Sequence, residues 1–143
     1  MGKLCSSSTA GSFAVNIRPL PEASFCPCQS GKPYAKCCGP YHRGAAAPTA
    51  EALMRSRYSA FALGLEDYVL STWEPRYRPE GAEIDPEIQW RRLVILDTED
   101  FGDTATVEFR AHWRNKMERG IMHERSSFVR EDGRWFYTIG VQL

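Results

Sequence analysis

Four cysteines lie within thirteen residues of this 143-residue chain. They form two close pairs: Cys26 with Cys28, and Cys37 with Cys38. A structural zinc ion needs four soft ligands in a tetrahedron, and two pairs joined by a turn-rich loop can supply them. The alternatives are a disulfide framework or four free thiols. Adjacent cysteines close a strained ring, and we expect no secretory signal, so the sequence favours a structural zinc ion.

Other residues near the cysteines offer further chemistry. His42 could replace one thiolate as an alternate ligand, or act behind the thiolates as a hydrogen-bond donor. Residues 23–50 contain no acidic residue but three basic ones: Lys32, Lys36 and Arg43. These charges either form a surface for an acidic partner or balance the net charge of about −2 that four thiolates give to a zinc site.

A second group of chemical interest centres on Arg57. Its position falls inside the apolar stripe of a predicted helix, between Leu53 and Phe61. A buried guanidinium needs a partner, and Glu124 or another acidic residue on a predicted strand is a candidate. One interpretation is a structural ion pair, or an Arg57 side chain that extends its charged end to solvent. The other makes Arg57 the anion-binding floor of a pocket. The other members of that pocket would be Tyr58, Trp73, Trp113 and His123.

The same residues give no recognisable catalytic arrangement. His123 and Glu124 are neighbours, and a strand sends neighbouring side chains to opposite faces, so they do not form an acid–base dyad. The sequence has no Ser-His-Asp order and no glycine-rich phosphate loop. We therefore assign no catalytic residue and favour a binding protein over an enzyme.

Two helices are predicted after the cysteine segment. Thr49 can cap the first helix, which an apolar stripe carries forward until Gly64 ends it. A shorter helix is predicted over 66–73, and it stops before Pro75. Residues 74–89 have the composition of a loop.

Strands follow from Trp90 onward, where the apolar period changes to two. The predicted strands are 90–96, 105–114, 121–130 and 135–141. Helices followed by an antiparallel meander indicate an α+β domain. The predicted organisation is a flexible tail over 1–24, a zinc knuckle over 25–44 and the α+β domain over 49–143.

The cysteine segment resembles the SEC-C motif, a zinc knuckle found in many bacterial proteins. The likeness covers both cysteine pairs, their separation, Ser30-Gly31, Tyr34 and Gly39. It implies that the metal ligands are Cys26, Cys28, Cys37 and Cys38. In that family the last ligand is Cys or His, so His42 stays a secondary candidate. Gln29 stands where the family usually has glycine.

The resemblance continues beyond the knuckle. Residues 49–61, Tyr68, Thr72-Trp73, 123–126 and 133–135 look like the YchJ family of small bacterial proteins. The likeness implies a nuclear-transport-factor-2-like cone, in which N-terminal helices lie against a curved antiparallel sheet around a pocket. It implies a fold and a metal but no reaction.

Composition narrows the function further. Eighteen basic and eighteen acidic residues cancel, so the overall charge gives no support to a nucleic-acid partner. No stretch approaches the roughly 20 apolar residues of a membrane span, and we expect a cytoplasmic protein. The leading hypothesis is an adaptor whose structural zinc knuckle contacts a protein partner. The alternative is a small-molecule-binding or enzymatic cone, and a homodimer could form through the open face of the sheet.

Overall fold

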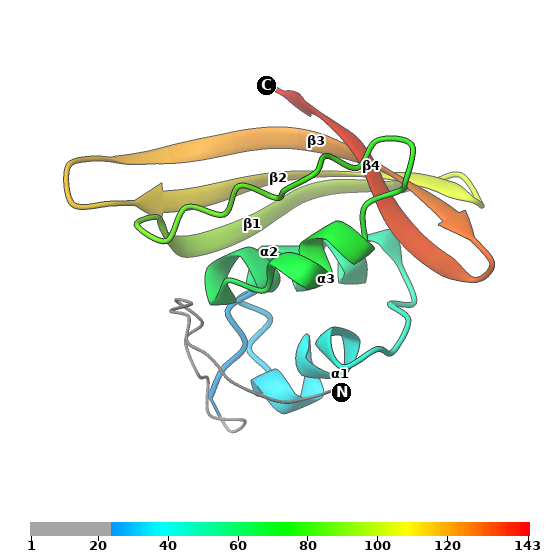
Figure 1. Ribbon diagram of the computed structural model, residues 1–143, viewed down its shortest axis with the longest axis horizontal. Coiled ribbons are helices and arrows are strands. Elements are labelled where there is room, and N and C mark those ends of the chain that lie inside the picture. Colours follow the sequence, from blue (N-terminus) through cyan, green and yellow to red (C-terminus); the bar gives the residue numbers. More distant parts are fainter. Residues whose placement is uncertain (1–23) are drawn as a thin grey trace.

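The computed structural model describes residues 24–143, so the predicted flexible tail lies almost wholly outside the described part of the chain. Within it, helices and a four-stranded antiparallel sheet form an α+β fold, as the sequence predicts. Helices α2 and α3 lie against one face of the sheet (Figure 1). The cysteine segment and α1 lie on the other side of α2, away from the sheet (Figure 1).

Two short helical turns lie in the cysteine segment, and two helices follow it. Their bounds are Tyr34–Lys36 for the 3-10 turn η2, Gly39–His42 for α1, Ala50–Leu63 for α2 and Glu66–Ser71 for α3. The Thr49 hydroxyl accepts a hydrogen bond from the N–H of Ala52 at 3.0 Å, which caps α2. Gly64 adopts a left-handed φ of 76° and ends the helix. Both signals confirm the predicted ends of α2.

Helix α3 ends two residues before its predicted limit. The reason is tertiary: Trp73 leaves the helix and forms a parallel bridge with Tyr137 of the last strand. The N–H of Tyr137 donates to the carbonyl of Thr72 at 2.8 Å. The end of α3 is thereby tied to the far edge of the sheet.

The sheet is a simple meander in the order β1-β2-β3-β4, with every neighbouring pair antiparallel. The strands are β1 Gln89–Asp100, β2 Thr104–Arg114, β3 Arg119–Glu131 and β4 Arg134–Gln142. Register shifts interrupt β1 against β2 at two places and β3 against β4 at one. Such irregularities bend a sheet and increase its twist, which suits a sheet that curves around α2.

The knuckle and the domain share one hydrophobic core. Leu53 and Met54 of α2 pack with Phe109 and Phe128 of the sheet, and the same cluster includes three of the cysteines. The cysteine segment is therefore packed on the domain rather than tethered to it. None of the helices within residues 24–143 is long and apolar enough to cross a membrane.

Candidate functional site

The four clustered cysteines converge on one point. Their sulfur atoms all lie within 4.8 Å of one another, so they could hold one metal ion. Cys26, Cys28 and Cys38 are at most 3% exposed, and Cys37 is half-buried. All four are free thiols, which argues against the disulfide alternative.

The loop between the two pairs folds back through local hydrogen bonds. The N–H of Cys26 donates to the carbonyl of Lys32 at 2.8 Å, and Gln29 and Gly31 adopt left-handed φ values of 70° and 87°. Glycine adopts that conformation most easily, which explains why the SEC-C pattern usually has glycine where Gln29 stands; Gln29 adopts it at some cost in strain.

Two serines contact the cysteine sulfurs from outside the cluster. The Ser59 hydroxyl on α2 donates to Cys38 Sγ at 3.3 Å and lies 3.5 Å from Cys26 Sγ. Ser30 Oγ lies 3.0 Å from Cys37 Sγ. Hydroxyl donors of this kind stabilise thiolates and orient them. Ser59 was not predicted from the sequence, where its only signal is a serine inside the buried part of α2.

The thiols compete with one another for negative charge. A hydrogen bond with the Cys28 thiol lowers the pKa of Cys26, while the same contact raises the pKa of Cys28 to about 11. Hydrogen bonding with Cys26 likewise raises the pKa of Cys38. The deprotonated form is thus favoured at Cys26 and disfavoured at Cys28 and Cys38. A divalent cation at the centre would stabilise all of them together.

His42 lies beside this cluster with both ring nitrogens occupied. Nε2 lies 2.8 Å from the carbonyl oxygen of Ser56, so it carries the proton and donates. Nδ1 then accepts from the Tyr34 hydroxyl. Because Nε2 carries the proton and the lone pair of Nδ1 accepts from Tyr34, His42 is not placed as an alternate metal ligand. It ties the knuckle to α2 instead, and burial lowers its pKa.

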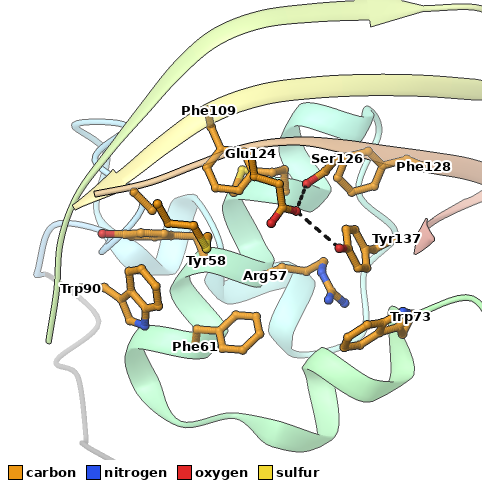
Figure 2. A pocket seen from close by; sticks show the side chains of 13 residues that line it. Arg57, Tyr58, Phe61, Trp73, Trp90, Phe109, Glu124, Ser126, Phe128 and Tyr137 are labelled. Atoms are coloured by element: carbon orange, nitrogen blue, oxygen red, sulfur yellow. Dashed lines mark hydrogen bonds between the residues drawn. The ribbon is translucent and has the colours of Figure 1, made fainter. Parts of the chain in front are cut away.

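A cavity of about 200 Å³ lies between α2 and the sheet. Figure 2 shows side chains from the helix and the strands converging on it. Its walls are mostly aromatic and include Tyr58, Phe61, Trp73, Trp90, Phe109 and Tyr137. Phe61, Trp73 and Trp90 are only half-buried, so part of the wall faces solvent.

Arg57 is the cation of this cavity and is only 6% exposed. One terminal nitrogen, Nη1, donates to the Val69 carbonyl and to the Thr72 hydroxyl, both at 2.7 Å. The guanidinium carbon lies 5.1 Å from the ring centre of Trp73 and 4.5 Å from that of Tyr137. Burial lowers its pKa to about 10, so it remains charged at neutral pH.

The expected ion pair between Arg57 and Glu124 does not form. Among the residues that the structure describes, the ion pairs within 4.0 Å do not include Arg57. The physical reason is that other groups already hold the guanidinium. These are a carbonyl, a hydroxyl and two aromatic faces.

Glu124 lines the same cavity from the sheet and is 9% exposed. Its Oε2 accepts from the Ser126 hydroxyl at 2.6 Å and from the Tyr137 hydroxyl at 3.4 Å (Figure 2). Its Oε1 accepts from Gln142 at 2.8 Å. Three donors thus fix this carboxylate in place. Ser126, Tyr137 and Gln142 were not found from the sequence, because nothing local links them to Glu124.

Two predicted pocket residues lie elsewhere. His123 points to the outer face of the sheet, where its Nε2 lies 2.7 Å from a Glu108 oxygen, as strand alternation requires. Trp113 is on the inner face but beyond the cavity, and its ring covers Gly120 so closely that a Cβ there would lie 2.8 Å from it. Of the six predicted pocket residues, four line the cavity: Arg57, Tyr58, Trp73 and Glu124.

Fold and site together define an NTF2-like α+β domain preceded by a cysteine knuckle. Comparison with known families agrees: residues 49–140 match the YchJ middle NTF2-like domain, and residues 26–40 match the SEC-C motif. A UPF0225 protein of Streptomyces coelicolor is 54% identical over 119 residues, which cover 80% of this chain and 93% of that protein. The chain belongs to the YchJ family, also called UPF0225.

Solved structures give the same result for the fold. The solution structure of a SEC-C motif protein from Rhodopseudomonas palustris is 37% identical, with a TM-score of 0.73 over 84% of this chain and 99% of that one. A crystal structure of a SEC-C motif protein from Psychrobacter arcticus is 28% identical, with a TM-score of 0.69 over 82% of each chain.

Proposed function

We propose that this protein binds a small molecule in the cavity between α2 and the sheet, and that a zinc ion in the knuckle holds α2 in place. The observation that carries the proposal is Arg57. A buried guanidinium without a direct ion pair is costly unless another group compensates its charge, and Glu124 faces Arg57 only across the cavity, outside the 4.0 Å of an ion pair. Arg57 faces a cavity, and a bound anion would supply that compensation.

Zinc is the metal that fits the knuckle. Four thiolates at about 2.3 Å from a central ion would lie about 3.8 Å from one another, and the sulfur atoms here are within 4.8 Å. Soft thiolate donors favour zinc over hard cations such as Mg²⁺ or Ca²⁺. Cys26, Cys28, Cys37 and Cys38 would fill all four positions. Such a closed site leaves no place for a reacting water, so its contribution is structural.

The position of the knuckle supports a structural role for the zinc site and a binding role for the cavity. Ser59 connects the cysteine sulfurs to α2, and Arg55 on the same helix donates to the carbonyl of Cys28 at 2.9 Å. The side chains of Arg57 and Tyr58, on the same helix, point toward the cavity (Figure 2). The metal site and the cavity therefore share one helix.

The tryptophans provide an internal test. Trp73 and Trp90 line the cavity, whereas Trp113 and Trp135 do not. A fragment library added to the zinc-loaded full chain should shift the indole N–H signals of the first two in ¹H–¹⁵N NMR spectra and leave the other two unchanged. A library containing anions, amines and neutral compounds that moves none of the four signals would refute the proposal.

A second candidate function is the adaptor role that the sequence favours. The observation in its favour is that Lys32, Lys36 and Arg43 are all exposed on the knuckle. Such charges support contact with an acidic protein surface. The test is a comparison of Lys32→Glu/Lys36→Glu with the control Lys116→Glu, which changes an exposed lysine in the turn between β2 and β3. Equal recovery of partner proteins by the two variants would contradict the role.

A further inference from the structure

The cavity contains two opposite charges that do not touch. Arg57 comes from α2 and Glu124 comes from β3, and both line the same space (Figure 2). Within residues 24–143, no ion pair within 4.0 Å joins Arg57 to Glu124. Each is instead held by neutral groups that keep it in position.

The guanidinium has unused hydrogen-bonding capacity. Of its five N–H donors, the two hydrogen bonds from Nη1 use two, so Nε and Nη2 retain about three. This leaves the edge that could bind a carboxylate through two parallel bonds. The flanking rings of Trp73 and Tyr137 hold the plane of the group and limit its rotation.

Glu124 offers the complementary acceptor. Its Oε1 accepts one bond, from Gln142, and each carboxylate oxygen has room for about two. A protonated amine placed here would meet a fixed negative charge and nearby aromatic faces, and both attract an ammonium group. The Arg57 and Glu124 charges sum to zero, so a dianion such as a phosphate monoester would be repelled by Glu124.

Size and lining complete the description of the ligand. About 200 Å³ is smaller than the roughly 300–1,000 Å³ of pockets that take drug-sized ligands. Beyond the two charges and three hydroxyl groups, those of Tyr58, Ser126 and Tyr137, the walls are apolar. The apolar residues include Phe109, Ala111 and Phe128 from the sheet and Met54 from the helix. The occupant is therefore small, with an apolar body and a polar end.

We infer that the cavity binds a small zwitterion with an apolar side chain, such as an apolar amino acid. Its carboxylate lies at Arg57, its ammonium group at Glu124, and its side chain against the aromatic wall. This assignment depends on the proposed small-molecule function and names the chemical class of the ligand.

Three compounds with the same phenyl group separate the contributions of the two charges. Phenylalanine carries both groups, 3-phenylpropanoate lacks the amine, and 2-phenylethylamine lacks the carboxylate. The indole signals of Trp73 and Trp90 should report phenylalanine binding. Each analogue should bind about tenfold more weakly or worse, because it leaves one buried charge of the site without its counterpart.

Two Glu→Gln variants supply the matched pair. Glu124→Gln should weaken phenylalanine about tenfold and make 3-phenylpropanoate the better ligand, because the site then carries a net positive charge. Glu108→Gln changes the adjacent strand on the outer face, where Glu108 contacts His123 and Arg125, and should leave all three affinities unchanged. Calorimetry or NMR titration at one pH gives the affinities.

The outcomes distinguish the inference from the proposed function. If 3-phenylpropanoate binds the wild-type protein as well as phenylalanine does, the zwitterion assignment is wrong while the small-molecule function stands. The same follows if Glu124→Gln binds phenylalanine like the wild type. If the fragment library also gives no shift at Trp73 or Trp90, both are wrong.

Discussion

Replacing Gly140 by alanine would place a methyl group on the carboxylate of Glu124. Gly140 pairs with Ser126 across β3 and β4, directly beside the polar end of the cavity. A Cβ built there would overlap the Glu124 carboxylate and would also lie 2.9 Å from the Tyr137 hydroxyl. The Glu124 side chain would have to leave its position.

The cost follows from the contacts that would be lost. Displacing Oε2 breaks its bonds from Ser126 and Tyr137, at about 1 kcal/mol each. Inserting a methyl group into a packed site costs about 1–3 kcal/mol, part of which the moving side chain relieves. We expect a loss of about 2–4 kcal/mol in the free energy of unfolding. For a chain of this length that corresponds to a fall of about 7–13 °C in Tm.

Thermal unfolding and phenylalanine titration together test this reasoning. The matched control is Gly81→Ala, whose Cβ would meet only a Glu66 oxygen at an ordinary 3.5 Å. The control should melt within a few degrees of the wild type and bind phenylalanine normally. A Gly140→Ala protein with wild-type Tm and wild-type affinity would refute the account of Glu124 as a fixed acceptor.

Three further predictions concern the knuckle. Purified protein should contain one zinc per chain by metal analysis, and Cys28→Ser should lower its Tm strongly, because structural zinc contributes directly to folding; a variant that melts like the wild type would contradict a structural metal. Ser59→Ala should weaken zinc binding by about tenfold in competition with a chromophoric chelator, since it removes the hydroxyl beside two sulfurs; unchanged affinity would exclude that role. Burial lowers the pKa of His42 below its ordinary value of about 6.5, so the unfolded chain takes up its proton first and stability falls as pH drops below 6.5. His42→Gln should therefore lose less stability than the wild type between pH 7 and pH 5, and equal losses would show that His42 does not contribute.

Local signals predicted the helices and strands well. Thr49 and Gly64 mark the ends of α2 because capping depends on residues next to the helix. Strand alternation correctly put His123 and Glu124 on opposite faces, but the expectation that His123 lines the pocket was wrong, because Glu124 is the one that faces inward. The last residues of β1 were missed because they are polar and exposed. They become a strand only by pairing with β2, as Glu99 does with Thr106.

Some members of the candidate site were predictable from the sequence, but their partners were not. The apolar stripe of α2 is enough to predict a buried Arg57. The groups that hold it are a carbonyl on α3 and a ring on β4, and no local pattern connects these segments to α2. Likewise the sequence identifies the four cysteines by spacing, whereas Ser59 lies twenty-one residues from Cys38. Long-range contacts of this kind depend on the assembled fold.

One turn of α2 contacts three parts of the structure at once. Ser56 hydrogen-bonds to Tyr68 and offers its carbonyl to His42, Arg57 and Tyr58 face the cavity, and Ser59 meets the cysteines. Deleting a single residue before this turn would rotate everything after it by about 100°. Each of the four side chains would then meet the wrong neighbour. Natural insertions and deletions in such chains should therefore avoid residues 50–59 and accumulate in the loop between α3 and β1.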